Sequence, residues 1–329
     1  MSSSANQMDT ILLAGGQGMR LRPLTARLPK PLLPVANRPL VSQILHGLAA
    51  SGIKRAALAT GYKADAMQSE LGAACEGVEL RHIVESAPLG SGGALHNVVA
   101  ECAVTGEVWI AGADILHNVD IAAVRKFHRA AVKRGGLVTI VSAEVEDATG
   151  FGICEADSDG RVGRFLEKPP AGATRSRLAN TALWVFSRAA LEMLPAGPSS
   201  IERDLFPALA ARGALWTWSY GNGFWLDCGT PSRLVEANLG ALAGKFPARL
   251  HGDRSGDSLL GTRCQMDDAA RVSQCVLGED VIVKQGAILD ACVLLEGAFV
   301  GEGVRLERCI VEHGAHVKAG TTARNKILT

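Results

Sequence analysis

The chain has 329 residues, of which 47% are hydrophobic, and it carries 34 Lys and Arg against 33 Asp and Glu. This length supports one large domain plus a small one. A net charge of +1 provides no field that would gather nucleic acid or an anionic membrane, so we predict neither partner and expect a local site for any anion. The sequence contains no membrane-spanning apolar run and no signal-peptide pattern, which predicts a cytoplasmic protein. Eight cysteines without a CxxC pair argue against a zinc knuckle or a thioredoxin-like site.

Short β-rich runs alternate with Ala- and Leu-rich helical stretches from Thr10 to about Leu242. The expected strands are Thr10–Ala14, Arg55–Thr60, Glu79–Val84, Val108–Ile110 and Val138–Val141. The expected helices are Leu40–Ala50, Ala64–Leu71 and Ile121–Lys133. This alternation predicts an α/β, Rossmann-like fold with a mostly parallel sheet covered on both faces. Because such sheets bind ligands at the carboxyl ends of their strands, we expect functional residues just after strands.

The composition changes near residue 245, where a polar stretch with Gly and Pro has the character of a linker. We therefore predict a first domain at residues 1–245 and a second at residues 246–329. Within the second, three consecutive 17-residue blocks begin at Cys275, Cys292 and Cys309 and stack without gaps. A weaker block precedes them, and a truncated one begins at Lys326.

Aligned blocks share aliphatic and small columns. The columns are Leu277, Leu294 and Val311; Val283, Val300 and Val317; and Gly286, Gly303 and Gly320. A fixed short period of this kind predicts a solenoid in which each coil is buried by its neighbours. With about six residues on each face, the repeat resembles the left-handed parallel β-helix of hexapeptide-repeat proteins. The cysteine column is then expected to be a packed ladder, not a metal or redox site.

The first expected strand leads into a glycine-rich turn, Gly15-Gly16-Gln17-Gly18, which is followed by Arg20 and Lys30. Glycines after a buried strand allow backbone N–H groups to approach an anion, and the two cations would neutralise phosphates. The turn is neither a Walker A motif nor a dinucleotide fingerprint. By itself it predicts only a tight turn.

The segment GGQGMRLRPLT, followed by PKPLLPVANRPL, closely resembles the signature of the sugar-1-phosphate nucleotidyltransferases. Further blocks occur in the family's order: PLGSGG at residues 88–93, FLEKP at 165–169 and FWLDCGTP at 224–231. The resemblance covers nearly the whole chain, because mannose-1-phosphate guanylyltransferases also carry a hexapeptide-repeat β-helix. It implies a nucleotidyltransferase domain followed by that β-helix. The implied reaction is Mg²⁺-dependent transfer of a nucleotidyl group from an NTP to a sugar-like 1-phosphate, with release of pyrophosphate.

The resemblance also implies roles for individual residues. Asp114 and Asp227 correspond to a Mg²⁺-binding pair, a hard ion that takes one or two carboxylates together with phosphates. Arg20 and Lys30 match groups near the NTP phosphates, and Lys168 matches the lysine that holds the sugar phosphate. With Asp114 and Asp227 they form the expected catalytic set. The expected sugar-binding residues are Glu167, Asn180 and Gly152.

The expected nucleotide-binding residues are Leu13, Ala14, Gly15, Gly16, Gly18, Glu85 and Gly90. Of these, Glu85 matches the family position that reads the edge of the base. An ionised carboxylate accepts the two adjacent donors of guanine, whereas thymine and uracil are better matched by Gln. GTP is therefore favoured, with thymidylyl, adenylyl or cytidylyl transfer as alternatives. A local structural role for Glu85 remains open.

Three residues depart from the family pattern. Met19 replaces a usual Thr or Ser, and Ala113 and Ala182 each replace a usual glycine. Added methyl groups near the substrate would reshape the pocket, so we hypothesise an unusual acceptor such as a heptose 1-phosphate or a valienol-like cyclitol 1-phosphate.

Other activities of the same fold are alternatives. One is a non-catalytic regulatory subunit, although the complete cationic and acidic set argues against it. Another is an additional acyltransferase activity in the β-helix, for which His313 and His316 are the candidates. The β-helix is more simply expected to make contacts between subunits of a homo-oligomer, because its apolar columns need covering at the ends.

Overall fold

The computed structural model describes residues 8–221 and 223–329. The described residues form two compact units: the first contains residues 8–16, 48–221 and 223–225, and the second contains Gln17–Gly47 and Leu226–Thr329. Helix α2 (Leu40–Ala50) and strand β14 (Trp225–Asp227) span the boundaries.

The first unit contains a ten-stranded sheet with helices packed against it. Its strands are β1 (Thr10–Ala14), β4 (Arg55–Thr60), β5 (Ala74–Cys75), β6 (Val78–Val84), β7 (Glu107–Gly112), β9 (Val138–Glu144), β10 (Gly152–Ala156), β11 (Val162–Glu167), β12 (Leu178–Ser187) and β13 (Leu215–Ser219), with β8 (Ile115–His117) outside it. Its helices are α3 (Ala64–Leu71), α4 (Gly90–Glu101), α5 (Ile121–Val132), α6 (Arg188–Leu191), the π-helix η3 (Ile201–Leu205) and α7 (Phe206–Ala211).

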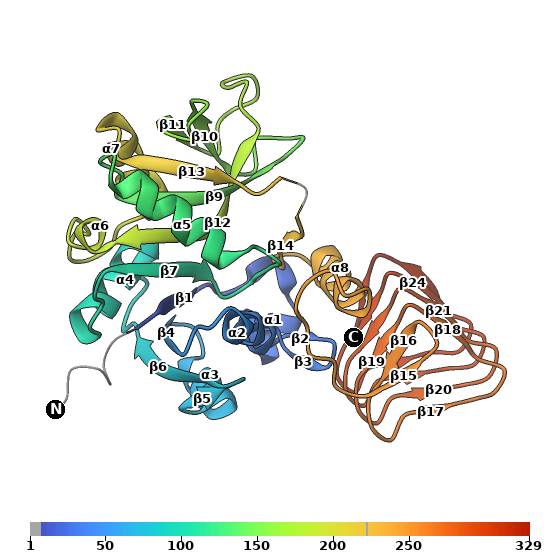
Figure 1. Ribbon diagram of the computed structural model, residues 1–329. Coiled ribbons are helices and arrows are strands. Elements are labelled where there is room, and N and C mark those ends of the chain that lie inside the picture. The colour runs from blue at the N-terminus through green and yellow to red at the C-terminus, as the bar shows by residue number, and fades with distance from the viewer. Residues whose placement is uncertain (1–7, 222) are drawn as a thin grey trace. The chain divides into compact units, whose positions relative to one another are not determined.

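The central strands of this sheet, β7, β1, β4 and β6, run parallel, and β13 runs parallel to β9. Antiparallel pairing of β12 with both β7 and β9, and of the hairpin β10–β11, extends the sheet. The predicted α/β class and each predicted strand and helix are confirmed, with ends that agree within a few residues. In Figure 1, α5 lies across β9, β12 and β13.

One apolar cluster joins the sheet of the first unit to α4, α6 and α7. At its centre, the rings of Trp184 and Phe206 meet edge to face with centroids 5.5 Å apart, and neither residue is more than 1% exposed. Burial of such large side chains contributes about 2 kcal/mol or more each. The cluster fixes β12, which carries Asn180, against the parallel strands.

The second unit contains a parallel β-helix and the connecting segments around it. Its first elements are η1 (Met19–Leu21), α1 (Leu24–Arg27), η2 (Lys30–Leu32), β2 (Pro34–Val35), β3 (Arg38–Pro39) and α8 (Pro231–Leu242). The β-helix strands are β15 (Asp253–Ser255), β16 (Ser258–Leu260), β17 (Gln265–Met266), β18 (Arg271–Ser273), β19 (Val276–Leu277), β20 (Ile282–Val283), β21 (Ile288–Asp290), β22 (Val293–Leu294), β23 (Phe299–Val300), β24 (Arg305–Glu307), β25 (Ile310–Val311), β26 (His316–Val317), β27 (Thr322–Arg324) and β28 (Ile327–Leu328).

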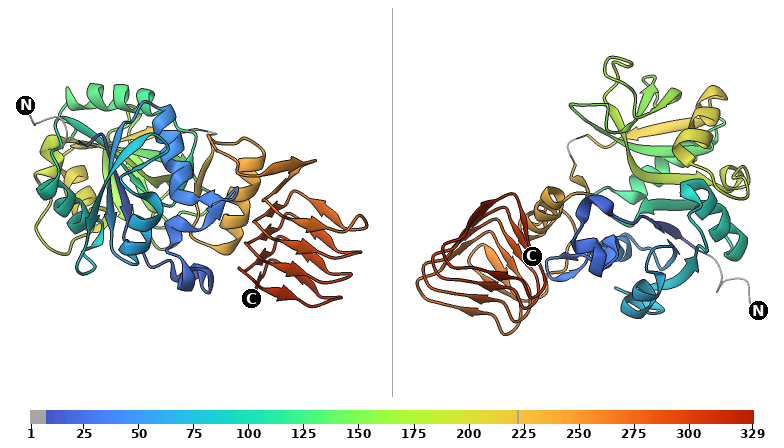
Figure 2. Two further views of the ribbon diagram at one scale, coloured as in Figure 1. Left: turned by 90° about the horizontal axis from the view of Figure 1, so that it is seen from below. Right: turned by 180° about the vertical axis from the view of Figure 1, so that it is seen from behind.

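These strands form three sheets in which each coil pairs with the next at the predicted 17-residue spacing, for example Val276 with Val293 and Val293 with Ile310. The left view of Figure 2 shows the coils stacked on one another. The arrangement is consistent with the predicted left-handed β-helix, and the predicted aliphatic columns form its core.

The cysteine column is buried as predicted, since Cys275, Cys292 and Cys309 are each at most 1% exposed. Each thiol donates to the carbonyl two residues earlier, at 3.1 to 3.3 Å. All three are free thiols, and no group of three or more metal-ligating side chains occurs among the described residues. The three cysteines therefore stack on one another in successive coils, and each thiol forms a hydrogen bond with the backbone of its own coil.

The later half of the glycine-turn signature anchors the β-helix, a role that its motif did not suggest. Ala36 and Asn37 form a left-handed turn between β2 and β3, with φ values of 51° and 61°. From this turn, Asn37 Nδ2 donates to the carbonyl of Leu277 at 2.8 Å, and Ala36 N–H donates to Oδ1 of the buried Asn238 at 2.8 Å. Gln43 exchanges two hydrogen bonds with the backbone of Arg249. These contacts join the signature segment, α8 and the β-helix within one unit.

Among the helices that the structure describes, none is long and apolar enough to cross a membrane.

Candidate active site

In the second unit, three predicted catalytic side chains lie together, and we call them the Asp227 cluster: Arg20, Lys30 and Asp227. Lys30 Nζ lies 3.2 Å from Asp227 Oδ1, and Arg20 Nη2 lies 3.9 Å from Oδ2. The Lys30 side chain is only 10% exposed, whereas that of Arg20 is 68% exposed. A buried ammonium needs a nearby anion, and a mobile guanidinium can reach one in solvent. The cluster is therefore suited to hold a polyphosphate.

The glycine turn makes this geometry possible at Gly18, whose φ is 62°. A Cβ atom there would lie 2.9 Å from Thr25 Cγ2 and 3.2 Å from Lys30 Cβ. The Thr25 hydroxyl donates to the Gly18 carbonyl at 2.9 Å and fixes the turn. Gly18 was predicted to bind the nucleotide; in the structure it allows the chain to pass closely over Lys30.

Gly229 was not among the predicted site residues, although its motif was recognised. It is buried, and a Cβ atom would lie 2.5 Å from Arg20 Nη2 and 2.9 Å from Asp227 Oδ1. A methyl group at this position would push the end of the Arg20 side chain or the Asp227 carboxylate out of its present position. Sequence spacing could not reveal this contact, because Arg20 and Gly229 are distant along the chain.

In the first unit, a cavity of about 300 Å³ opens at the end of β1, and we call it the Glu85 cavity. Its lining includes five of the predicted nucleotide-binding residues, namely Leu13, Gly15, Gly16, Glu85 and Gly90. Its other lining residues are Pro88 and Ser91, which belong to the PLGSGG block but were given no role from the sequence, and Ala59 and Ala94, which sequence analysis did not identify. Ala14 is buried, at 6% exposed, and does not line the cavity.

The Glu85 carboxylate lies over the glycine turn, where a Cβ on Gly15 would be 3.5 Å from Oε1. Burial raises the pKa of Glu85, while the N–H of Leu89, which donates to Oε2 at 3.4 Å, lowers that pKa. The carboxylate therefore presents oxygen acceptors to a small cavity of limited solvent access. Such an edge suits a ligand that offers two adjacent N–H donors.

Asp114 follows the end of β7, in agreement with the expectation that functional residues come just after strands. Its Oδ1 folds back over Gly112, where a Cβ would lie only 2.7 Å away. The neighbouring Ala113 is 1% exposed, and its N–H donates to the Leu13 carbonyl at 2.9 Å. The extra methyl of Ala113 is thus buried within the protein, and its effect on the pocket stays a prediction.

The predicted sugar-binding carboxylate, Glu167, ends β11 opposite Gly152 of β10. A Cβ on Gly152 would lie 2.8 Å from Glu167 Oε2, so this glycine makes room for the carboxylate. Lys168 has a left-handed backbone, with φ of 48°, and its Nζ lies 3.8 Å from Glu167 Oε1. Burial and then the neighbouring Glu202 raise the pKa of Glu167, and Lys168 and Arg203 oppose them. The pair leaves an exposed ammonium beside a half-buried acceptor.

Asn180 lies at an irregularity of β12, where pairing with β9 shifts register between Asn180 and Trp184. Its Oδ1 accepts from the Ala182 N–H at 3.0 Å and from Trp184 Nε1 at 2.7 Å. These bonds hold Ala182 at φ of 59°, a conformation that usually requires glycine. The predicted sugar contact can therefore come only from Nδ2 of Asn180, because its oxygen is already used.

Glu202 and Ser91 form a link that sequence analysis missed. Ser91 lines the Glu85 cavity, and its hydroxyl donates to Glu202 Oε2 at 2.7 Å while accepting from the Ile201 N–H at 2.9 Å. Glu202 lies on the π-helix η3, a local geometry frequent at functional sites. Since Glu202 also raises the pKa of Glu167, it connects the cavity electrostatically with the carboxylate that is predicted to bind the sugar.

The structure thus brings together Arg20, Lys30 and Asp227 in the second unit, while Asp114 and Lys168 belong to the first. Convergence of the five groups on one substrate remains a prediction. Asp227 has a carboxylate that is 32% exposed, and Asp114 supplies the same kind of hard oxygen donor. Two such carboxylates fit Mg²⁺, which completes its coordination with phosphates and water.

A protein-family comparison assigns residues 9–244 to "Nucleotidyl transferase" and residues 246–324 to "GlmU-like, C-terminal hexapeptide". A relative from Mycobacterium tuberculosis, mannose-1-phosphate guanylyltransferase, is 31% identical over 306 residues, covering 87% of this chain and 84% of the relative. The mannose-1-phosphate guanylyltransferase catalytic subunit beta of Drosophila pseudoobscura pseudoobscura is 34% identical, covering 69% of this chain and 60% of that protein.

Among solved structures, HddC from Yersinia pseudotuberculosis resembles this chain with a TM-score of 0.60 and 25% identity, covering 70% of this chain and 98% of HddC. A second structure of HddC, complexed with GMP-PN, gives a TM-score of 0.59 at 24% identity with the same coverage. The family model spans the strands that carry the Glu85 cavity, and it also spans the Asp227 cluster. From fold, site residues and relatives together, the chain belongs to the nucleotidyl transferase family and is an enzyme.

Proposed function

We propose that this enzyme transfers a guanylyl group from GTP to the phosphate of a sugar-like 1-phosphate, in the presence of Mg²⁺, and releases pyrophosphate. The observation that carries the proposal is the position of the Glu85 carboxylate at a cavity formed by the glycine turn. Guanine offers N1–H and N2–H₂ side by side, which an ionised carboxylate accepts together. The names of the relatives, mannose-1-phosphate guanylyltransferases, support the same base.

The Asp227 cluster would act on the phosphates of GTP. In the proposed reaction an oxygen of the acceptor phosphate forms a bond with the α-phosphorus, and the bond from that phosphorus to the bridging oxygen of pyrophosphate breaks. The acceptor phosphate is already ionised, so no general base is needed, and positioning and charge neutralisation supply the catalysis. Arg20, with its exposed guanidinium, is suited to follow the leaving pyrophosphate, and the buried Lys30 to neutralise charge in place.

Asp114 and Asp227 would hold Mg²⁺, which when bound neutralises phosphate charge and orients the triphosphate. Without it, Asp227 is paired with Lys30 at 3.2 Å and has Arg20 nearby. Two cations beside one carboxylate leave positive charge to spare for phosphate oxygens. The residues of this chain thus provide both the hard oxygens for the ion and the cations for the nucleotide.

The acceptor would be held by Lys168 through its phosphate and by Glu167 and Asn180 through hydroxyl groups. Relatives point to mannose 1-phosphate, while the left-handed Ala182 replaces a usual glycine near Asn180. The methyl group of Ala182 would change the shape of the sugar pocket, and for this reason we propose a different acceptor, such as a heptose or cyclitol 1-phosphate. The exposed Met19, at 54%, lies beside Arg20 and leaves the backbone donors of the turn in place.

We also propose that the domain boundary lies near residue 245 and that the β-helix contributes to a homo-oligomer. Light scattering on the full chain tests the oligomer: a particle mass equal to one 34.4 kDa chain would remove it.

The function is tested by measuring pyrophosphate release with GTP, ATP, UTP, CTP and dTTP, each combined with mannose, glucose, heptose and cyclitol 1-phosphates. We expect GTP to give a kcat/KM at least about tenfold above the other nucleotides, and activity to disappear when EDTA removes the metal. A preference for another base would contradict the guanylyl proposal while keeping the family reaction. If mannose 1-phosphate is much the best acceptor, the unusual-acceptor proposal is wrong.

A further inference from the structure

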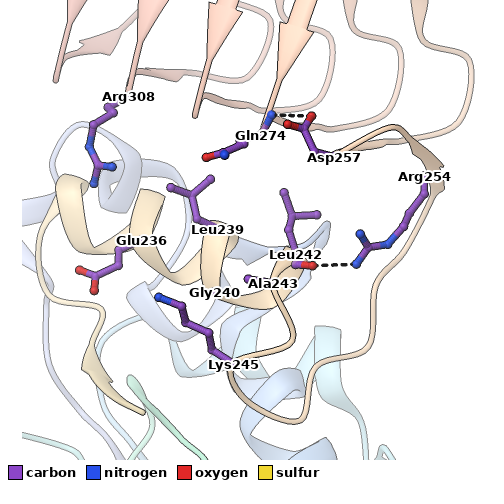
Figure 3. A pocket seen from close by; sticks show the side chains of 10 residues that line it. All are labelled: Glu236, Leu239, Gly240, Leu242, Ala243, Lys245, Arg254, Asp257, Gln274 and Arg308. Atoms are coloured by element: carbon purple, nitrogen blue, oxygen red, sulfur yellow. Dashed lines mark hydrogen bonds between the residues drawn. The ribbon is translucent and has the colours of Figure 1, made fainter. Parts of the chain in front are cut away.

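A second cavity, separate from the residues discussed so far, lies within the second unit between α8 and a corner of the β-helix. Its volume is about 490 Å³, within the range of small-molecule sites. Figure 3 shows the side chains of Leu239 and Leu242 pointing from α8 into this space. Gln274 and Arg308 enter it from the β-helix side. Neither the family match nor the proposed reaction gives it a role.

The lining carries three cationic side chains from three different segments: Lys245 follows α8, Arg254 lies on β15, and Arg308 precedes β25. Arg254 Nη2 donates to the Leu242 carbonyl at 2.8 Å, which leaves most of its five N–H donors for another partner. This hydrogen bond holds the Arg254 guanidinium at the C-terminal end of α8, where it lines the cavity.

Arg308 is the most informative of the three. It sits at a left-handed corner of the β-helix, with φ of 50°, and is half-buried. Within the part of the chain that the structure describes, no carboxylate lies within salt-bridge distance of its guanidinium and no acceptor forms a hydrogen bond with it. A half-buried guanidinium that lines a cavity and pairs with no protein anion is suited to an anionic ligand.

Two carboxylates also line the cavity, Glu236 and Asp257. Asp257 is already committed, because it accepts from the Gln274 N–H and the Ser273 hydroxyl, both at 2.9 Å, and from the Ser258 hydroxyl at 3.2 Å. Those bonds lower the pKa of Asp257 and direct its charge toward the β-helix corner. Glu236 is exposed on the surface of α8. The cations therefore outnumber the carboxylates around the cavity.

From these observations we propose that the cavity binds a phosphorylated small molecule with a planar apolar part, of the class of nucleoside phosphates. Arg308, Arg254 and Lys245 would contact the phosphates. Leu239 and Leu242 would contact the apolar ring, and the Gln274 side-chain amide would supply directional hydrogen bonds. This ligand site is additional to the Glu85 cavity and does not depend on the proposed reaction.

The cavity lies on the same helix that follows Asp227. Helix α8 begins at Pro231, four positions after Asp227, and Thr230 caps it by accepting from the Arg233 N–H. Asn238 in its middle is hydrogen-bonded to Ala36 of the signature segment. A ligand at Leu239 and Leu242 would therefore contact a helix fixed at both the site and the signature segment, and it would protect α8 from hydrogen exchange.

Binding is tested by calorimetric titration of the full chain with ADP, with adenosine and inorganic phosphate as separate probes. The variants are Arg308→Glu, which reverses a charge, and Leu239→Trp, which fills the cavity. Glu85→Ala alters the other cavity, and Arg305→Glu is a matched control at an exposed arginine of the β-helix. Thermal unfolding of each variant verifies that it is folded.

We expect ADP to bind and the affinity to fall at least about tenfold in both Arg308→Glu and Leu239→Trp, with Arg305→Glu and Glu85→Ala retaining this site. Adenosine and phosphate alone should each bind at least about tenfold more weakly than ADP. Affinity that is unchanged in both cavity variants, or lost only in Glu85→Ala, overturns the proposal. Equal binding of phosphate and ADP overturns the assignment of the leucines to a ligand ring.

Discussion

Two of the regions with left-handed backbone, the β-helix and the surroundings of Asn180, differ in what that conformation does. In the β-helix, Gly286, Gly303 and Gly320 have φ values of 68°, 62° and 70°, and they recur at the 17-residue period. Near the proposed sugar site, Lys168 and Ala182 have φ values of 48° and 59°, and each occurs once. The repeated left-handed turns connect equivalent coils of the β-helix, whereas the left-handed residues Lys168 and Ala182 position individual side chains.

The comparison separates left-handed backbone that only closes a repeated turn from left-handed backbone that positions a side chain at the proposed sugar site. Gly286, Gly303 and Gly320 adopt positive φ at little cost. The β-helix also holds non-glycine residues at positive φ with the same period, namely Gln274, Ala291, Arg308 and Asn325. A lysine or alanine in the same conformation costs about 1 kcal/mol or more, which the surrounding bonds must offset. Asn180 supplies such bonds to Ala182. Substitutions in the two regions should therefore separate stability from activity.

We expect the largest difference between an effect on activity and an effect on stability when the same Gly-to-Ala change is made in the Asp227 cluster and in the β-helix. Gly229→Ala would place a Cβ 2.5 Å from Arg20 Nη2 and 2.9 Å from Asp227 Oδ1. Displacing the arginine from the carboxylate should lower kcat about 100-fold. Gly303→Ala, by contrast, meets no atom within 4 Å and should cost about 1 kcal/mol of stability through its φ alone.

Steady-state kinetics and thermal unfolding of both variants measure this contrast. A Gly303→Ala protein as inactive as Gly229→Ala would show that the β-helix turns also control the site. As a further control, Gly47→Ala lies in α2, where its Cβ would make an ordinary contact 3.9 Å from Pro247, and it should retain full activity.

The next largest effect concerns base selection. Glu85→Gln keeps the size of the side chain but replaces one acceptor oxygen by a donor. We expect kcat/KM for GTP to fall about 10- to 100-fold, with UTP and dTTP affected little. The ratio of the two rates is measured directly with competing nucleotides. An unaltered preference for GTP would mean that Glu85 has a structural role at the strand end.

The same carboxylate predicts a pH dependence. Burial raises the pKa of Glu85, so on lowering the pH it takes up a proton earlier than a solvent-exposed glutamate. Protonation removes an acceptor for guanine, and selectivity for GTP over UTP should decrease toward acid pH. Glu85→Gln should show no such decrease. A selectivity that is flat with pH in the wild-type enzyme would contradict this assignment.

The smallest effect is expected at Ala182. Replacing it with glycine removes the strain of its positive φ and should stabilise the fold by about 1 kcal/mol. Ala179→Gly, on the regular part of the same buried strand, should destabilise it by a similar amount. Chemical unfolding compares the two. If Ala182→Gly is destabilising as well, the alanine methyl must contribute packing that outweighs its backbone strain.

Sequence reasoning succeeded where a pattern repeats or a strand is followed by a motif. The 17-residue columns predicted the β-helix register, including the pairing of Leu277 with Leu294 and of Val283 with Val300. The strand-helix alternation predicted the α/β class and located the glycine turn at the end of β1. Both signals are local or periodic, so one chain is sufficient to read them.

Contacts between distant segments were not predictable in this way. The role of Gly229 depends on the close approach of the Arg20 side chain. The hydrogen bond between Ser91 and Glu202 depends on a π-helix, which the hydrophobic pattern of the sequence does not predict. The turn of Ala36 and Asn37 was interpreted as part of a phosphate signature, yet it anchors α8 and the β-helix. In each case the partner is more than 100 residues away.

We propose that Asp114 and Asp227 act on one triphosphate. A double-mutant cycle on kcat/KM for GTP, with Asp114→Asn, Asp227→Asn and the double variant, tests it most directly. If the two carboxylates serve one metal and one transition state, each single change should cost about 1000-fold and the double change little more. Losses that multiply in the double variant, or a single variant with full activity, would contradict the account.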